Sequence, residues 1–213
     1  MGKIFAIGDI HGCLFKLKEM MNLIEIDPVD DTLIFLGDYI DRGPDARGVV
    51  NLILHIKGSI NNVFCLMGNH EQLFLDYHLD NMNENLFLIN GGMSTVLSYG
   101  LTGTGDSKKM NVPETHMQFF TTLYPYYETD DYIFVHAGLR SGIPLAQQDR
   151  DDILWIRNEF IASAYDFGKI VVFGHTPLFA PLVATNKIGI DTGAVYGGKL
   201  TCVELPEVKI HQV

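Results

Sequence analysis

Cysteine, positive charge and long hydrophobic runs are all scarce in this sequence. The three cysteines, Cys13, Cys65 and Cys202, include no Cys-x-x-Cys pair, so we expect no disulfide framework and a reducing compartment. Lysine and arginine number 15 against 26 aspartates and glutamates, which gives a net charge of −11. We therefore expect no binding of nucleic-acid backbones through a basic face. A local positive site for a small anion remains compatible with this charge.

No apolar run approaches the roughly 18 residues that a membrane span needs, so we expect no membrane partner. The short run of residues 3–7, apolar from residue 4 onward, leads directly into a polar motif at residue 8, which leaves no room for a signal peptide. We therefore expect a cytoplasmic protein. The 213 residues, of which 47% are hydrophobic and 19% charged, fit a single globular domain over 1–213.

One pattern recurs five times: a short apolar run ends in a small residue and then in polar residues suited to catalysis. The runs cover residues 3–7, 32–36, 63–67, 132–135 and 170–173. Their length and their Ile, Val and Phe content predict strands buried on both faces. Helical stretches at 14–24 and 47–56 separate the first three runs, and this alternation indicates an α/β protein with layered helices and strands.

The middle and the end of the chain differ from this pattern. Residues 71–130 contain helical stretches at 72–79, 86–99 and 114–123, so we predict a helical insertion there, with a mobile polar loop at 103–112. Near the end, short apolar runs predict a meander that would form a second sheet. These runs cover residues 183–185, 187–190 and 200–205.

Four of the eight histidines follow the predicted strands, together with two aspartates and an asparagine. These residues are Asp9, His11, Asp38, Asn69, His70, His136 and His175. A single histidine at a strand end would most simply be a hydrogen-bonded residue of the core. Seven such residues at the carboxyl edge, where open α/β sheets bind ligands, predict a metal site. Ligands with nitrogen and oxygen but no thiolate favour Mn²⁺, with Fe or Zn²⁺ as the other choices. Two divalent ions carry more positive charge than the two carboxylates, Asp9 and Asp38, can neutralise. The remaining positive charge suits a bound phosphate.

Five motifs at these strand ends resemble those of the PPP family of metallophosphoesterases, and are most similar to its short bacterial and phage protein phosphatases. They read GDIHG at residue 8, GDYIDRGP at 37, GNHE at 68, HAG at 136 and GHTP at 174. The resemblance implies the calcineurin-like metallophosphoesterase fold. This α/β fold is a two-sheet β-sandwich flanked by helices.

The resemblance also implies a role for each site residue. Asp9, His11 and Asp38 would hold one metal ion. The second ion would be held by Asp38, Asn69, His136 and His175. The substrate phosphoryl group would be bound by Arg42 and Arg157. His70 would protonate the leaving oxygen, and Asp41 would orient His70. The chemistry suits these roles, because a guanidinium matches phosphate and histidine is the usual proton donor near neutral pH.

The reaction implied is hydrolysis of phosphomonoesters, first of all phosphoserine and phosphothreonine in proteins, by in-line attack of a hydroxide that bridges the metals. The alternative is a hydrolase of dinucleoside polyphosphates such as diadenosine tetraphosphate. Asp41 and Glu71 favour the protein phosphatase, because symmetrical hydrolases of that kind typically have alanine and aspartate there. However, some bacterial relatives with the DRGP form also cleave such nucleotides.

Two further expectations follow from the resemblance. A scaffold without catalytic activity is disfavoured, because all six ligand positions and His70 are filled. The chain is also much shorter than the eukaryotic phosphatases of this family, so we expect no regulatory subunit.

Overall fold

Two β-sheets form the centre of the molecule, whose computed structural model describes residues 2–102 and 109–213. The first sheet contains β1 (Ile4–Ile7), β2 (Thr32–Phe35), β3 (Asn62–Cys65), β11 (Asp191–Thr192), β12 (Lys199–Leu205) and β13 (Lys209–Gln212). The second contains β6 (Tyr126–Glu128), β7 (Tyr132–Val135), β8 (Ile170–Phe173), β9 (Leu182–Val183) and β10 (Lys187–Gly189). Strands β1, β2 and β3 run parallel, as do β7 and β8.

The sheets pack face to face, and alternate residues along each strand enter different hydrophobic cores. Ala6 of β1 and Phe134 of β7 belong to one cluster that draws on both sheets. Phe5 and Ile7 point to the opposite face of the first sheet, where they join a separate cluster with the helices. Because side chains alternate along a strand, β1, β2, β7 and β8 are buried on both faces, as the apolar runs predict. In β3, three of the four residues are only partly buried.

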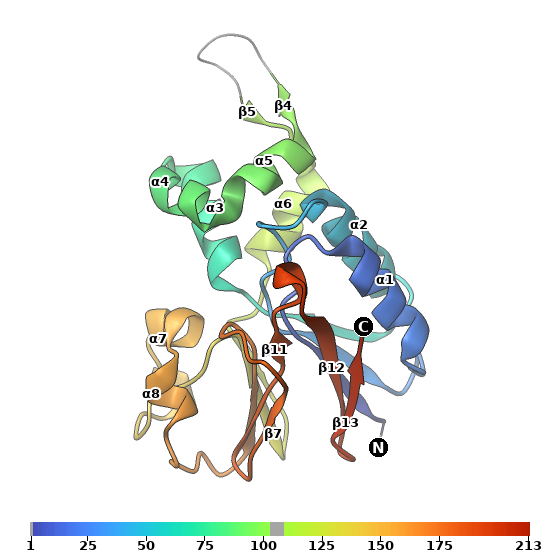
Figure 1. Cartoon of the computed structure of the whole chain (residues 1–213), viewed down its shortest axis with the longest axis vertical. Helices are drawn as coiled ribbons and strands as arrows, with labels where there is room; N and C mark the ends of the chain where they lie inside the picture. Colours follow the sequence, from blue (N-terminus) through green and yellow to red (C-terminus); the bar gives the residue numbers. More distant parts are fainter. Residues whose placement is uncertain (1, 103–108) are drawn as a thin grey trace.

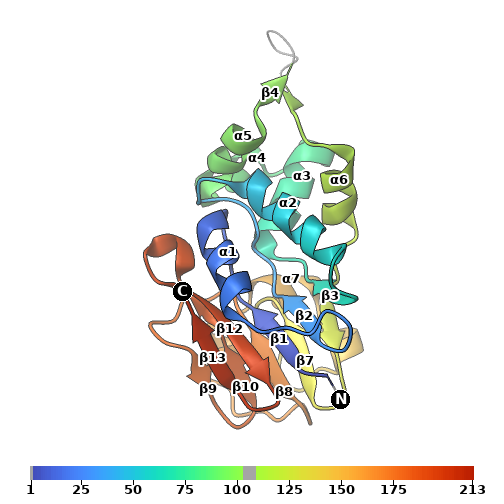
Figure 2. The same cartoon turned by 90° about the vertical axis from the view of Figure 1, so that its right-hand side faces the viewer.

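Helices cover the outer faces of both sheets (Figures 1 and 2). The outer face of the first sheet packs on α1 (Leu14–Leu23) and α2 (Ala46–Lys57). The second sheet packs on α7 (Arg150–Trp155) and α8 (Asn158–Ile161). In α2 the Asp45 side chain accepts a hydrogen bond from the amide of Gly48 and so caps the helix N-terminus. The predicted two-sheet sandwich flanked by helices is therefore confirmed.

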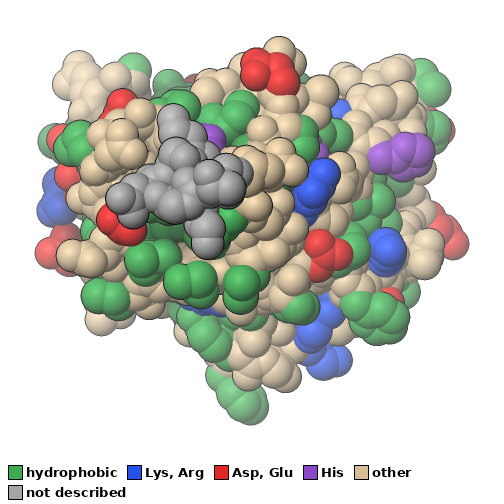
Figure 3. All heavy atoms as spheres, turned by 90° about the horizontal axis from the view of Figure 1, so that it is seen from above, with side chains coloured by type: hydrophobic (Ala, Val, Ile, Leu, Met, Phe, Trp, Pro, Cys, Tyr) green, Lys and Arg blue, Asp and Glu red, His purple; other side chains and the backbone are tan. Residues whose placement is uncertain are grey.

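A helical segment lies across one end of the sandwich (Figure 1). It comprises α3 (Asn69–Asp80), α4 (Glu84–Phe87), the π-helical turn η1 (Leu88–Gly92), α5 (Met93–Tyr99), the hairpin strands β4 (Leu101–Thr102) and β5 (Lys109–Met110), and α6 (Glu114–Thr121). At Gly91, φ is 101° and the helix is kinked. Seen end-on, this part of the surface exposes many apolar side chains (Figure 3), with Ile89 and Leu97 among the most exposed.

Two boundaries differ from the predictions. The helices end at Thr121, and β6 begins at Tyr126, so the second sheet starts inside the predicted 71–130 segment. The expected meander is also divided. β9 and β10 pair in the second sheet, whereas β12 pairs antiparallel with β1 in the first. Residues 103–108 of the predicted mobile loop lie outside the described residues. Within the described residues, no helix is long and apolar enough to cross a membrane.

Candidate metal centre

The residues predicted for the site come together where the carboxyl ends of strands from both sheets meet. Asp9 and His11 follow β1, Asp38 follows β2, and Asn69 opens α3 just after β3. His136 follows β7 and His175 follows β8, so the second sheet contributes two histidines. All six side chains are buried, as are Asp41 and His70. The sandwich therefore gathers polar groups from five separate loops into one buried cluster.

The loops that hold these residues have unusual backbone conformations. Only eight described residues other than glycine have positive φ, and five of them are predicted site residues. These five are His11, Asp38, Asp41, Arg42 and His175, with φ between 45° and 68°. Positive φ costs free energy for a residue with a β-carbon, so surrounding contacts must hold it in place. Such strain at one cluster is typical of a functional site.

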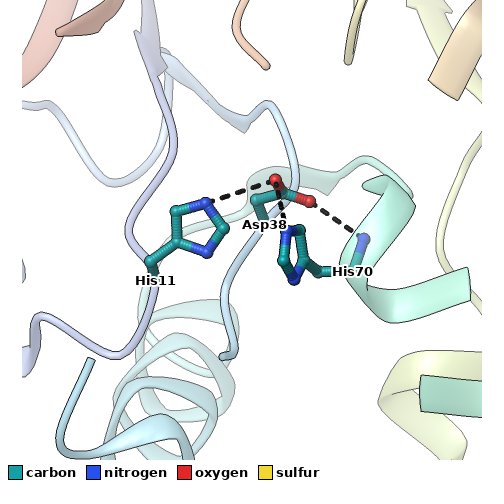
Figure 4. Close-up of side chains that lie close together, drawn as sticks. All are labelled: His11, Asp38 and His70. Atoms are coloured by element: carbon teal, nitrogen blue, oxygen red, sulfur yellow. Dashed lines mark hydrogen bonds and ion pairs between the residues drawn. The ribbon is translucent and has the colours of Figure 1, made fainter. Parts of the chain in front are cut away.

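Asp38 lies at the centre of the cluster. Its Oδ2 atom is 3.4 Å from Nε2 of His11, and its Oδ1 atom is 3.4 Å from Nε2 of His136. Figure 4 shows Asp38 between His11 and His70, and the amide of His70 donates a hydrogen bond to Asp38 Oδ1 at 3.2 Å. Each carboxylate oxygen thus faces a histidine from a different sheet. This arrangement suits a carboxylate that bridges two cations.

The histidines present nitrogen lone pairs to this centre. Nδ1 of His11 lies 2.9 Å from the carbonyl oxygen of Ile40, and Nδ1 of His136 lies 2.8 Å from that of Leu36. A carbonyl can only accept, so Nδ1 carries the proton in both rings and Nε2 is left as an acceptor. Hydrogen bonding of one ring nitrogen to a backbone carbonyl is the usual arrangement around metal-binding histidines.

Asn69 and His175 complete the part of the cluster nearest His136. The side-chain oxygen of Asn69 lies 3.0 Å from Nε2 of His136 and 2.9 Å from Nδ1 of His175. Nε2 of His175 is buried and has no hydrogen-bond partner among the described residues. The amide of His175 donates a bifurcated hydrogen bond to both carboxylate oxygens of Asp9, each at 3.1 Å, and so ties the loop after β1 to the loop after β8. Buried polar atoms without partners are costly, and a bound cation would satisfy them.

Burial sets the protonation of these groups. It lowers the pKa of His11 to about 3 and that of His175 to about 2, so both rings are neutral and can act as ligands near neutral pH. Burial, together with the negative charges of Asp191 and Asp38, raises the pKa of Asp9 well above its usual value. Burial opposes ionisation of Asp38 as well, but the surrounding histidines outweigh it and lower its pKa.

The chemistry of the donors therefore fits a pair of divalent cations. Two groups of side chains have possible ligand atoms within 4.8 Å of one another: His11, Asp38 and His70, and Asp38, His136 and His175. The groups share Asp38, which is the arrangement of a dinuclear site. Carboxylate, imidazole and amide oxygen are the ligands present, and they do not identify the metal.

His70 differs from the other histidines in its partner. Its Nδ1 atom lies 2.7 Å from Oδ2 of Asp41. Its Nε2 atom is buried 3.9 Å from Asp38 and has no hydrogen-bond partner in the part of the chain that the structure describes. Thr95 of α5 donates a hydrogen bond to the other oxygen of Asp41 at 2.5 Å and accepts one from the Asp41 amide at 2.9 Å. The Asp41 carboxylate is thus hydrogen-bonded to both His70 and Thr95.

The two arginines lie on opposite parts of the site. Arg42 is half-buried, and its Nη1 atom is 2.6 Å from Nε2 of His11. Arg157 is exposed, and its Nη1 atom donates to the carbonyl of His175 at 3.2 Å. The structure thus brings one arginine to the His11 group and the other to the His175 loop.

Glu71 holds two of these loops together. It lies in the first turn of α3 and belongs to neither ligand group. Its carboxylate accepts hydrogen bonds from the amides of Asp38 and Tyr39 at 2.9 Å and from that of Gly68 at 3.1 Å. One buried carboxylate therefore fixes the backbone on both sides of Asp38.

The sequence motifs do not single out two side chains that reach this site. Thr95 lies outside the strand-end motifs, and no local pattern marks it. Tyr196, whose ring lies beside Arg42, follows the Asp191-Thr192-Gly193 turn. A lone aromatic residue in a glycine-flanked turn is a weak signal for such a position.

A family model for the calcineurin-like phosphoesterases matches residues 2–207. This chain belongs to that family. The match covers nearly the whole sequence, and it confirms both the resemblance of the motifs and the predicted fold. The chain is therefore a metallophosphoesterase.

The curated relatives have two different activities in their names. The asymmetrical bis(5'-nucleosyl)-tetraphosphatase PrpE of Bacillus cereus is 30% identical over 99% of this chain and 94% of its own. The enzyme of the same name from Oceanobacillus iheyensis is 28% identical over 99% and 92%. Serine/threonine-protein phosphatase 1 of Salmonella typhimurium is 29% identical over 95% of this chain and 91% of its own.

A solved structure described as a candidate diadenosine tetraphosphatase resembles this chain with a TM-score of 0.79. It is 24% identical and is matched over 100% of this chain and 93% of its own. A serine/threonine phosphatase from Saccharomyces cerevisiae gives a TM-score of 0.64 at 16% identity. The match covers 99% of this chain and 79% of that one. At these identities the likeness shows the shared fold alone.

Proposed function

We propose that this protein is a metal-dependent hydrolase of dinucleoside polyphosphates that splits a tetraphosphate unequally. The observation that carries the proposal is the end-to-end match to relatives named as asymmetrical tetraphosphatases. Asp41 and Glu71 favour the protein phosphatase at the level of sequence. However, that argument compares this sequence with symmetrical hydrolases, whereas the relatives matched here are named asymmetrical. It therefore does not count against the proposal.

The reaction follows from the substrate's chemistry. Water adds to one phosphorus, and the phosphoanhydride bond between the first and second phosphates breaks. The products are a nucleoside monophosphate and a nucleoside triphosphate. The bond broken is a phosphoanhydride, so the leaving group is a phosphate oxygen.

Six residues would hold two divalent cations, for which Mn²⁺ is our first choice and Fe or Zn²⁺ are the others. Asp9, His11 and Asp38 would hold the first; Asp38, Asn69, His136 and His175 would hold the second. When bound, the cations would polarise the phosphoryl oxygens and make water more acidic. The protein itself supplies a cluster of buried donors with neutral His11 and His175 rings and a central carboxylate.

Three further roles belong to side chains around this centre. Arg42 and Arg157 would bind the phosphoryl oxygens, since a guanidinium donates in the fork that phosphate accepts. His70 would give a proton to the leaving oxygen from its buried Nε2 atom. Asp41 would orient His70 through the 2.7 Å contact with Nδ1.

Hydrolysis of phosphoserine and phosphothreonine in proteins is the second candidate. It is favoured by the match to serine/threonine-protein phosphatase 1, which covers 95% of this chain. The two functions share the metal centre and differ in what surrounds it. An assay on different substrates therefore distinguishes the two functions, whereas the geometry of the metal ligands does not.

A panel of three substrates tests the proposal. Purified protein with Mn²⁺ is assayed on diadenosine tetraphosphate, a phosphoserine peptide and p-nitrophenyl phosphate, with products separated by chromatography. We expect the highest kcat/KM on diadenosine tetraphosphate, with AMP and ATP as products. Two molecules of ADP, or a higher kcat/KM on the peptide, would contradict the proposal.

Removal of metal is expected to abolish activity. The ligand set contains no thiolate, so Mn²⁺ should be among the best activators on adding metals back. The measurement is turnover of p-nitrophenyl phosphate after exhaustive chelation, with metal content determined by mass spectrometry, followed by titration with Mn²⁺, Fe²⁺ and Zn²⁺. Full activity in protein shown to contain no metal is the contrary result.

Replacing Arg42 or Arg157 with alanine is expected to lower kcat/KM about 10²-fold, the usual effect of losing one donor to transition-state charge. The loss should be similar for diadenosine tetraphosphate and p-nitrophenyl phosphate, because both share the reacting phosphoryl group. A loss confined to the larger substrate would instead assign that arginine to the rest of the molecule. Arg47→Ala, on α2, serves as the control.

A further inference from the structure

Tyr196 places an exposed aromatic ring at the edge of the metal centre. It ends the short 3-10 helix η4 (Ala194–Tyr196), which follows β11. The residue is 62% exposed although it is large and apolar. Cζ of Arg42 lies 5.6 Å from the centre of its ring, within the range of a cation–π contact.

The turn that carries Tyr196 is tightly fixed. Glycines at both ends have positive φ, 69° at Gly193 and 86° at Gly197. The amide of Tyr196 donates to the carbonyl of Gly193 at 2.9 Å, and the amide of Gly198 donates to the same oxygen at 3.0 Å. Lys16 of α1 donates to the carbonyl of Gly198. The backbone that carries the ring is therefore held in place before any ligand binds, which lowers the entropic cost of using the ring.

Arg42 connects this ring to the metal centre. On one side its guanidinium is 2.6 Å from Nε2 of His11, and on the other it lies over Tyr196. A phosphate bound at Arg42 thus has the ligand centre on one side and the exposed residue Tyr196 on the other. A group attached to that phosphate can lie against the ring.

We propose that Tyr196 is a stacking platform for a nucleobase of the substrate. The inference rests on the proposed function, since a nucleotide joins a phosphate to a large aromatic ring system. Base–aromatic stacking tolerates any base, because every base has a π-face. Tyr196 would therefore contribute affinity for nucleotides in general and would not select adenine.

Binding of AMP and of ribose 5-phosphate to Mn²⁺-loaded protein tests the platform without any turnover. AMP and ribose 5-phosphate both carry a phosphate on a ribose, and only AMP carries a base. Isothermal titration calorimetry should give about tenfold tighter binding of AMP in the wild-type protein. In Tyr196→Ala this ratio should fall to about one, whereas Tyr196→Trp should retain it. Tyr165→Ala, which removes another exposed tyrosine, is the matched control.

Two results would overturn the platform. One is equal binding of AMP and ribose 5-phosphate by the wild-type protein. The other is an unchanged ratio in Tyr196→Ala. Neither result depends on hydrolysis of diadenosine tetraphosphate, so the platform and the proposed function fail separately. If the wild-type protein hydrolyses this substrate but the ratio of AMP to ribose 5-phosphate affinity is unchanged in Tyr196→Ala, the proposed function stands and the platform is wrong.

Discussion

Asp38→Asn is expected to lower kcat about 10³-fold or more. A metal ion's Lewis-acid contribution is worth several kcal/mol, and each ~1.4 kcal/mol is tenfold in rate. Asp38 is the only residue common to both ligand groups, with its two oxygens facing His11 and His136. The asparagine keeps the shape but replaces one charged oxygen with an amide nitrogen that cannot act as a ligand. Both cation sites should therefore weaken together.

Measuring the number of bound metal ions distinguishes weakened cation sites from a general loss of activity in Asp38→Asn. The wild-type protein should bind two Mn²⁺ ions, and Asp38→Asn fewer than two at the same free concentration. Asp9→Asn should weaken mainly one ion, because Asp9 is assigned to the first metal alone. Asp130→Asn, in an exposed loop, controls for the loss of one negative charge. If Asp38→Asn kept two tightly bound ions and near-normal turnover, the bridging role would be wrong.

The strand-end motifs predicted which residues would meet, because the ends of parallel strands lie at one edge of a sheet. They could not assign the strands to sheets. The apolar runs before Asp38 and before His136 look alike, yet β2 lies in the first sheet and β7 in the second. Strand β12 pairs with β1 across almost the whole chain, with Ile4 opposite Leu205. Local periodicity contains no information on such a pairing.

Contacts between loops were equally beyond prediction. Thr95 reaches Asp41 only because α5 packs over the loop after β2, where the amide of Arg42 donates to the carbonyl of Gly91 at 3.1 Å. Tyr196 meets Arg42 because the turn after β11 folds toward the same edge. Both contacts depend on tertiary packing. The residue roles that the family resemblance implies remain predictions until the variants are measured.

His70 has the geometry expected of a group that protonates the leaving oxygen. It is buried, and Asp41 and Thr95 form a hydrogen-bonded chain behind it. Its Nε2 atom lies 3.9 Å from Asp38 and forms no hydrogen bond with any residue that the structure describes. The need for such a proton depends on the leaving group. A serine alkoxide or a phenolate leaves poorly, whereas p-nitrophenolate and a phosphate oxygen leave well.

His70→Asn should therefore lower kcat about 10²–10⁴-fold on a phosphoserine peptide or phenyl phosphate, the usual contribution of general acid catalysis. On p-nitrophenyl phosphate and diadenosine tetraphosphate the loss should be about tenfold or less. Thr95→Val should show the same dependence on the leaving group with smaller losses, because it only loosens Asp41. The assay requires both metals to remain bound and chemistry to be rate-limiting, shown by single-turnover kinetics. Equal losses on good and poor leaving groups would assign His70 to positioning the attacking water or the phosphate.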